Sequence, residues 1–179
     1  NAPTNLVATV GDEQVSITFT APTDTGGSAI TNYKYSTDNG STYTAFSPAV
    51  TGTSATITGL TNGTSYSIKL RAVNSAGDGG ESVAVASTPI TTTNAPTNLV
   101  ATVGDEQVSI TFTAPTDTGG SAITNYKYST DNGSTYTAFS PAVTGTSATI
   151  TGLTNGTSYS IKLRAVNSAG DGGESVAVA

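Results

Sequence analysis

The sequence predicts an all-β protein made of two antiparallel β-sandwiches in tandem, each of seven strands. Three observations predict this fold: residues 1–86 recur without a substitution as residues 94–179, apolar and polar residues alternate along short stretches, and turn residues separate those stretches. Alternation with a period of two is typical of half-buried strands, and two one-faced sheets bury each other in a sandwich. No stretch carries the helical spacing that a TIM barrel or a Rossmann fold needs between its strands.

Seven stretches of the first repeat alternate in this way, and the second repeat has the same seven. Their ranges are 5–10, 14–20, 29–36, 43–49, 54–60, 65–74 and 82–87. The side chains expected to face the core are Leu6, Ala8, Val10, Val15, Ile17, Phe19, Tyr33, Tyr35, Ala55, Ile57, Leu60, Tyr66, Ile68, Leu70, Ala72, Val83 and Val85.

The first two stretches predict a hairpin that is followed by a loop. Gly11–Asp12 supplies the turn between them, and residues 14–20 alternate without a break. Pro22 and Gly26–Gly27 then mark a loop, because these residues punctuate regular structure.

The third stretch places Tyr33 and Tyr35 on one face with Lys34 on the other. Asn39–Gly40 follows, and Asn-Gly is a strong signal for a tight hairpin turn. We therefore expect a half-buried strand that turns back into the fourth stretch.

The fourth stretch, 43–49, indicates an edge strand. It ends at Pro48, which has no N–H to donate to a neighbouring strand. Tyr43 and Phe46 would lie near this edge, so we expect both to be partly exposed.

The last three stretches complete the two sheets. Gly59 predicts a kink at the end of the fifth, and Asn62–Gly63 predicts a turn into residues 65–74, which alternate most clearly. The stretch 75–81 (SAGDGGE) has loop composition and lacks the spacing of a phosphate-binding loop. Residues 82–87 then close the sandwich.

Composition excludes several classes of function. Cys, Met, Trp and His are absent, so disulfides, thiolates and imidazole ligands are unavailable. The net charge of −6 argues against nucleic acid and against anionic membrane surfaces, and no apolar run approaches the roughly 20 residues that span a bilayer. Neutral hydroxyl and amide side chains dominate, so we expect an extracellular or cell-surface bacterial protein. The chain opens on Asn1 without an apolar leader, which indicates a segment of a longer protein.

Four stretches carry a resemblance to a known family: APTNLVAT, VSITFTAP, GGSAITNYKY and GLTNGTSYSIKLRAVNSAG. They resemble strands of the fibronectin type III domain, an immunoglobulin-like sandwich, and the resemblance covers both repeats. Leu60 and Tyr66 match the family's leucine and corner tyrosine, whereas Phe19 and Phe112 stand where the family usually has a Trp. The resemblance implies the sheets A-B-E and C′-C-F-G, with a corner hydroxyl at Tyr66 and Tyr159 that bonds to the backbone.

The sequence carries no constellation for catalysis. No His is present to activate the many Ser and Thr hydroxyls, and the acids lie in predicted turns, which do not build a concave site. Lys34, Lys69 and Arg71 are expected to form a small basic stripe on the outer face of adjacent strands. Because both lysines point outward, an isopeptide bond is not expected either. We predict no enzyme activity and no cofactor.

Calcium is the one metal that the acidic turns bring into consideration, since Ca²⁺ prefers carboxylate and carbonyl oxygens. Asp12 and Glu13 lie in a turn at the exit end of the first repeat, and Asp117, Asp171 and Glu174 lie in loops at the entry end of the second. One hypothesis is an inter-domain calcium site at this junction. The other is that these acids are solvated and keep the protein soluble, and the lack of a D-x-D-x-D spacing favours it.

We divide the chain into repeat 1 at 1–89, a linker at 90–93 and repeat 2 at 94–179. Pro89 and Pro96 flank a β-branched run without glycine, which predicts a semi-stiff joint. Identical copies suit a spacer, because a spacer needs only length. The predicted function is therefore a non-catalytic, semi-rigid stalk or spacer in a larger extracellular bacterial surface protein.

Two alternatives remain open. The first is a weak, polyvalent adhesion module, whose many sites would add avidity. The second is an accessory domain of a secreted carbohydrate-active enzyme, for which a planar row of exposed aromatic side chains would be expected. We expect a monomer whose partners are neighbouring identical repeats of the parent chain, without nucleic acid and without membrane insertion.

Overall fold

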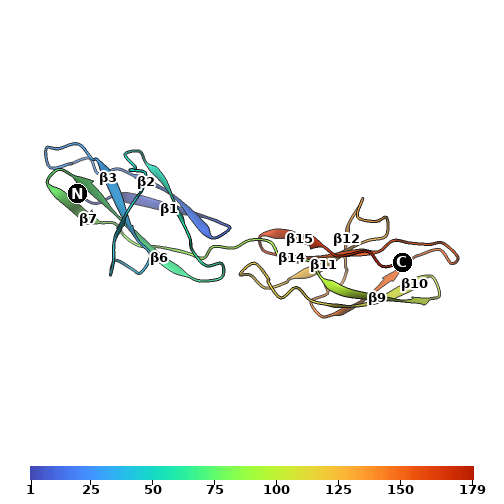
Figure 1. Cartoon of the computed structure of the whole chain (residues 1–179). Helices are drawn as coiled ribbons and strands as arrows, with labels where there is room; N and C mark the ends of the chain where they lie inside the picture. The colour runs from blue at the N-terminus through green and yellow to red at the C-terminus, as the bar shows by residue number, and fades with distance from the viewer. The chain divides into compact units, whose positions relative to one another are not determined.

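The computed structural model describes all residues 1–179, which form strands, turns and loops (Figure 1). The chain divides into two compact units, Asn1–Ile90 and Thr91–Ala179. Each unit contains two antiparallel sheets, so the predicted all-β tandem sandwich is confirmed. No helix in the structure is long and apolar enough to cross a membrane.

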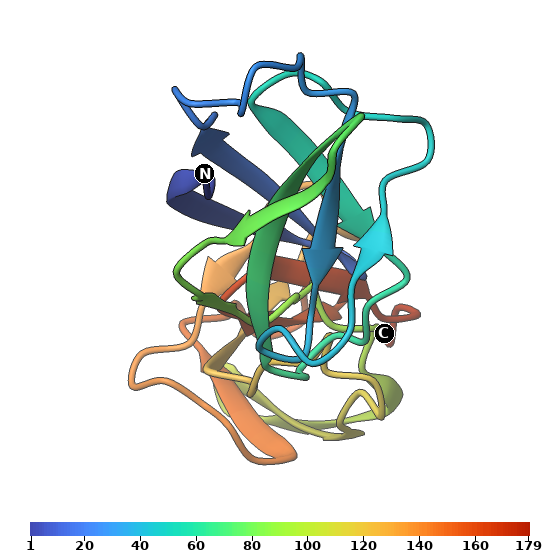
Figure 2. The same cartoon turned by 90° about the vertical axis from the view of Figure 1, so that its left-hand side faces the viewer.

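The first unit has eight strands. They are β1 (Thr4–Gly11), β2 (Gln14–Thr20), β3 (Asn32–Ser36), β4 (Thr44–Ala45), β5 (Ser54–Thr58), β6 (Tyr66–Asn74), β7 (Gly77–Glu81) and β8 (Val85–Ser87). One sheet has the order β1-β2-β5, and the other has the order β4-β3-β6-β7 with β8 also paired to β6. Figure 2 shows these strands in its blue-to-green part. The two orders are those of the sheets A-B-E and C′-C-F-G.

The second unit repeats this arrangement. Its strands are β9 (Thr97–Gly104), β10 (Gln107–Thr113), β11 (Asn125–Ser129), β12 (Thr137–Ala138), β13 (Ser147–Thr151), β14 (Lys162–Asn167) and β15 (Gly170–Glu174). The sheet orders are β9-β10-β13 and β12-β11-β14-β15. In place of β8, a single antiparallel bridge joins Ile161 to Val178.

The alternation in β2 becomes one buried and one exposed face, as predicted. Val15, Ile17 and Phe19 are buried, and the residues between them are exposed. In the β2–β5 pair, Val15 lies opposite Ile57 and Ile17 lies opposite Ala55. Since register fixes which face of a strand is buried, this pairing places the apolar side of both strands against the second sheet.

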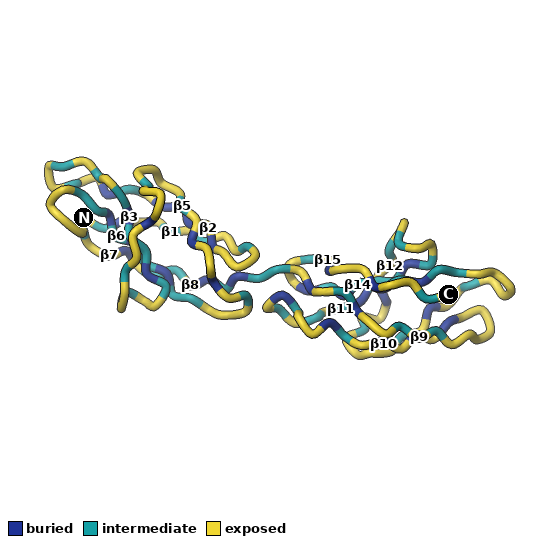
Figure 3. The backbone as a smooth tube through the Cα atoms, in the orientation of Figure 1, coloured by how far each residue is buried: buried dark blue, intermediate teal, exposed yellow.

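The core of the first unit lies between the two sheets. In Figure 3 buried residues alternate with exposed ones along strands such as β2, and the turns and loops are mostly exposed. The Phe19 ring meets Tyr33 edge-on with centroids 4.7 Å apart, an arrangement worth about 0.5–1.5 kcal/mol beyond burial. Phe19 thus fills the position where a Trp is usual. The buried residues are Val15, Ile17, Phe19, Tyr33, Phe46, Ile57, Leu60, Ile68, Leu70 and Ala72.

The expected exposure of Phe46 is wrong. Strand β4 is an edge strand of two residues, as Pro48 predicts. Phe46 follows it but folds back onto Tyr35, with ring centroids 4.8 Å apart, and is 8% exposed. A backbone bond from Phe46 N to Tyr33 O, 3.1 Å long, holds the ring in this position.

The predicted loop 75–81 is also wrong, because most of it is strand β7. Asp78 lies opposite Val73, and Glu81 lies opposite Arg71 on β6. Glycines favour a strand poorly, but Glu81 faces cations on the neighbouring strand β6, and Asp78 faces Lys34 on β3 beyond it. Cross-strand pairs of opposite charge stabilise a sheet, and alternation of apolar residues does not reveal them.

Val83 points outward, contrary to prediction, and is 88% exposed. Ser82 causes the change: its backbone N donates to Leu70 O, and its Oγ accepts from Leu70 N, both at 2.9 Å. The Ser82 hydroxyl thereby takes the place of the backbone carbonyl that would otherwise accept from Leu70 N, and the edge strand is interrupted between β7 and β8. Val10, also expected inside, is 42% exposed near the turn into β2.

Candidate functional site

The outer face of the larger sheet carries a compact group of charges in each unit. Glu81 on β7 lies 2.9 Å from Lys69 Nζ and 3.0 Å from Arg71 Nη2, and both cations come from β6. Lys34 on β3 pairs with Asp78 at 2.8 Å. The three cations lie on the outer face as predicted, but acids of β7 pair with all of them, so the face is not a basic stripe.

The charges shift the affinities of these groups for protons. Lys69 and then Arg71 hold the pKa of Glu81 below its usual range. In the second unit, Tyr136 and then Lys162 lower the pKa of Glu174. Both carboxylates therefore stay ionised and hydrogen-bonded, which suits a structural role and not proton transfer near neutral pH.

A second polar network orders the turn between β3 and β4. Asp38 accepts hydrogen bonds from Ser36 Oγ at 2.6 Å, Thr42 Oγ1 at 2.6 Å and Thr42 N at 3.0 Å. These donors favour the carboxylate and hold its pKa well below the ordinary value. Asn39 in the same turn has φ of 60°, as the Asn-Gly signal predicts.

The corner tyrosine has the expected role. Tyr66 Oη accepts a hydrogen bond from Thr61 N at 3.0 Å, five residues upstream. Tyr159 Oη makes the same bond with Thr154 N at 3.0 Å. In both units the tyrosine hydroxyl therefore holds the backbone of the preceding loop.

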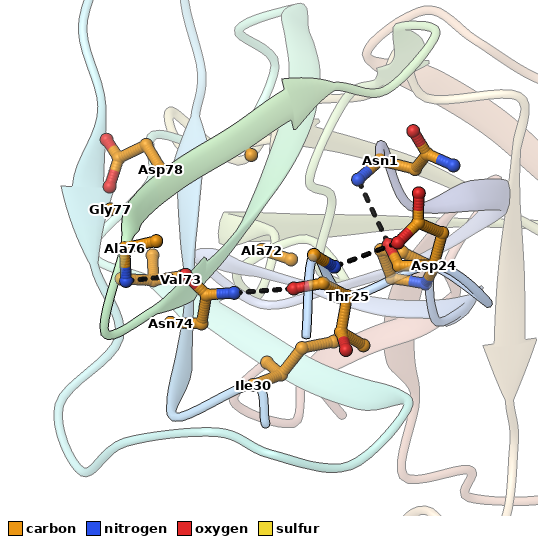
Figure 4. A pocket seen from close by; sticks show the side chains of 13 residues that line it. Asn1, Asp24, Thr25, Ile30, Ala72, Val73, Asn74, Ala76, Gly77 and Asp78 are labelled. Atoms are coloured by element: carbon orange, nitrogen blue, oxygen red, sulfur yellow. Dashed lines mark hydrogen bonds between the residues drawn. The ribbon is translucent and has the colours of Figure 1, made fainter. Parts of the chain in front are cut away.

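A small cleft opens at the loop end of the first unit, with a volume of about 210 Å³. Figure 4 shows Asn1, Asp24, Thr25, Ile30 and Asn74 around it. Asn74 Nδ2 donates to Thr25 O at 2.7 Å, and the terminal amine of Asn1 donates to Asp24 O at 3.2 Å. The lining combines these backbone carbonyl and amide groups with apolar side chains such as Pro22 and Ala72.

Hydrogen bonds inside the first unit hold the turn that contains Asp12 and Glu13, two of the acids considered for calcium. Asp12 Oδ1 accepts from Asn62 Nδ2 at 2.8 Å, and Glu13 N donates to Asn62 Oδ1 at 2.9 Å. Asn62 thus ties the β1–β2 turn to the loop before β6. Glu13 has φ of 50°, so the backbone of this turn is held in a left-handed conformation.

The acids of the second unit are also engaged. Asp117 accepts from Gly119 N at 2.8 Å, Asp171 pairs with Lys127 at 2.8 Å, and Glu174 lies 3.6 and 3.4 Å from the cations of β14. No three Asp, Glu, His or Cys side chains gather where they could hold a metal ion. The calcium hypothesis stays a prediction.

Sequence reasoning missed the cleft and the stacking of Arg71 on Tyr43. The cleft involves three segments that are distant in sequence, so no local pattern marks it. The charge pairing had a signal: Lys69 and Arg71 are two residues apart on one strand face, and Glu81 follows within reach of a neighbouring strand.

The sheet orders and the corner tyrosines of both units are those of immunoglobulin-like β-sandwich repeats. The sequence model of the fibronectin type III domain matches residues 1–88 and 94–179. The chain therefore belongs to the fibronectin type III family, as the resemblance in the sequence indicates.

Several bacterial enzymes contain a similar region. Chitinase A1 of Niallia circulans is 36% identical over 186 aligned positions, which cover 96% of this chain and 24% of that protein. Endoglucanase B of Cellulomonas fimi is 35% identical over 82% of this chain and 15% of its own length. Exoglucanase B of the same species is 38% identical over 88% of this chain and 14% of its own length. The chain thus spans under a quarter of each relative.

A solved structure shows the same fold. The crystal structure of chicken CNTN1 FN1-FN3 domains has a TM-score of 0.53 and 21% identity to this chain. The similar region covers 99% of this chain and 66% of that one. At this identity the likeness supports the fold alone.

Proposed function

We propose that this chain is a non-catalytic spacer within a larger, secreted bacterial protein, and that it sets the separation between other domains. The observation that carries the proposal is that the residues on both sides of the boundary between the units are hydrogen-bonded within their own unit. Gly63 N donates to Pro89 O at 2.9 Å inside the first unit, and Thr91 N donates to Gly119 O at 2.9 Å inside the second. Only Ile90 stands between these two hydrogen-bonded residues.

A joint of this kind favours a restricted hinge. A Gly/Ser tether would behave as a flexible coil, whereas here one β-branched residue separates two backbones that the folds already hold. Pro89 has a fixed φ, which reduces the freedom of the joint further.

The surface supports a spacer over a binding module. No aromatic side chain is exposed: Phe19, Phe46 and Tyr33 are buried, and the remaining tyrosines of each unit are half-buried. Tyr, Trp and Arg usually supply the central contacts of an interface, and Arg71 is paired with Glu81 and stacked on Tyr43.

The relatives favour a secreted enzyme as the parent protein. The similar regions belong to a bacterial chitinase and bacterial glucanases. We infer that the chain serves as an accessory segment of such an enzyme and that the catalytic residues lie in other domains. The extracellular location follows from the same inference.

Distance measurements between spin labels test the spacer. The chain has no Cys, so Thr9→Cys and Thr102→Cys on exposed faces of β1 and β9 give two specific attachment sites. We expect a narrow distance distribution for the native joint. A matched variant with Gly-Ser-Gly-Ser-Gly in place of residues 89–93 should give a broad one, and equally broad distributions would refute the restricted hinge.

Binding to insoluble chitin and cellulose tests the alternative role. A spacer should stay in the supernatant with both polysaccharides, at the level of an unrelated acidic protein. Retention that is saturable and competed by soluble oligosaccharide would favour a carbohydrate-binding accessory domain instead.

A further inference from the structure

The cleft of the first unit has an occupied counterpart in the second unit. The two units share one sequence, so each lining residue has an equivalent 93 positions later. In the second unit, the extended residues Thr91–Thr93 pass over the equivalent of the open cleft. This difference between identical sequences shows what kind of chain the cleft fits.

Backbone hydrogen bonds hold these threonines in the second unit. Thr91 N donates to Gly119 O at 2.9 Å, and Thr91 O accepts from Asn167 Nδ2 at 2.8 Å. Further along, Thr93 O accepts from Gly173 N at 3.0 Å. The segment therefore lies between the loop after β10 and strand β15 as an added piece of extended chain, a mode that depends little on side-chain identity.

Burial changes accordingly. Thr93 is 3% exposed, and Asn167 is 4% exposed where its equivalent Asn74 is only half-buried. Gly119 is buried, whereas the equivalent Gly26 is exposed. The threonine segment thus covers polar groups that stay open to solvent in the first unit.

Where the threonine segment passes, two of the lining residues are glycines, and any larger side chain there would collide with it. A Cβ on Gly119 would collide with the Thr91 carbonyl, and a Cβ on Gly172 would collide with Thr93. At Gly26, by contrast, a Cβ would meet no atom within 4 Å. The first unit therefore has the space that the second unit fills with peptide.

We propose that the cleft lined by Asp24, Thr25, Gly26, Asn74 and Gly79 is a binding site for an extended Thr-Thr-Thr segment joined in front of Asn1, such as a preceding repeat of this sequence would supply. The path already matches: Asn1 N donates to Asp24 O at 3.2 Å, and Asn94 N donates to Asp117 O at 3.0 Å. Each repeat is then completed by the last residues of the joint before it. Repeats in an array thereby stabilise their successors in one direction along the chain.

Extension of the full chain tests this site. Ser-Thr-Pro-Ile-Thr-Thr-Thr, the sequence of residues 87–93, is fused ahead of Asn1, and a matched control carries Ser-Thr-Pro-Ile-Gly-Gly-Gly. Both extensions leave the folded residues unchanged, so loss of folding is not a concern. The readouts are the ¹H–¹⁵N resonances and the amide exchange rates of the first unit.

With the threonine extension, we expect the resonances of Gly26, Asn74 and Gly80 to move onto those of Gly119, Asn167 and Gly173. The Gly80 amide should exchange about tenfold more slowly or more, because Gly173 N has an acceptor in Thr93 O. The glycine control should produce less of both changes. Unmoved resonances with the threonine extension, or equal changes with both extensions, would overturn the proposal.

Discussion

Arg71 lies over the ring of Tyr43, with its guanidinium carbon 4.3 Å from the ring centroid. The second unit repeats the contact between Arg164 and Tyr136 at 4.2 Å. The same guanidinium pairs with Glu81 at 3.0 Å, so one planar group joins strand β6 to its edge strand β7 and to the segment before β4. The contact explains why β7 forms although it contains three glycines.

Substitution of Arg71 by Lys should weaken this edge. Lysine keeps the charge near Glu81 but loses the planar contact with Tyr43. We expect the thermal midpoint of the first unit to fall by about 2–4 °C, which differential scanning calorimetry would resolve from the unchanged second unit. Lys69→Arg, which keeps an ion pair with Glu81, is the matched control and should cause little change.

The Asp38 network predicts a pH dependence. The pKa of Asp38 is lowered in the folded state, so its stabilising effect is complete above the ordinary value of 3.8 and is lost as the pH falls through the folded value. In Asp131, hydrogen bonds from Thr135 and Ser129 lower the pKa to about 2. Asp38→Asn should destabilise the first unit at pH 7 and show a smaller loss of stability between pH 4 and pH 2 than the native chain.

Carboxyl chemical shifts provide the direct measurement. Both Asp38 and Asp131 should titrate below the ordinary aspartate pKa of 3.8. A titration of Asp38 at its ordinary value would contradict the hydrogen-bonded geometry, whatever the thermal data show.

The alternation of apolar residues was enough to predict most of the fold, because burial against a second sheet is what orders these strands. Ile17, Leu70 and Ile57 are buried where the period of two places them. The Asn-Gly turn followed from local chemistry, and the corner role of Tyr66 followed from the resemblance to the fibronectin type III domain. These features depend on neighbours in sequence or on a single face.

The misplaced elements depend on partners that are distant in sequence. Val83 turns outward because the Ser82 hydroxyl, in place of a backbone carbonyl, accepts the hydrogen bond from Leu70 N on β6. Phe46 is buried because β4 ends where the Phe46 ring can pack against Tyr35. The cleft was missed for the same reason: Asn1, Asp24 and Asn74 meet only in the folded unit. Periodicity within one strand contains no information about such contacts.

The outward position of Val83 has a simple consequence. Val83→Thr should change the stability of the first unit by less than about 0.5 kcal/mol, as is usual for exposed sites. Val85 packs against the core, so Val85→Thr should cost about 1 kcal/mol or more, because it brings a hydroxyl to a partly buried position. Urea unfolding of both variants would compare them, and equal losses would show that Val83 is buried in solution.

Calcium should leave the protein unchanged. Asp171 pairs with Lys127, and Glu174 lies beside Lys162 and Arg164, so a cation would have to displace these partners. We expect the same thermal midpoint with millimolar calcium as with chelator. Heat of binding in calorimetry, abolished by Asp171→Asn, would instead support a site that includes this residue.

Removal of a tyrosine hydroxyl should lower the thermal midpoint of the first unit at position 66 but not at position 33. Tyr66→Phe removes the acceptor of Thr61 N and should lower the thermal midpoint of that unit by about 4 °C. Tyr33 Oη is buried without a hydrogen-bond partner, so Tyr33→Phe removes an unpaired polar group while keeping the ring against Phe19. It should leave the midpoint unchanged or raise it, since a buried hydroxyl without a partner is costly. Calorimetry with the native second unit as internal reference checks both, and a clear loss of stability in Tyr33→Phe would mean that this hydroxyl has a partner in solution.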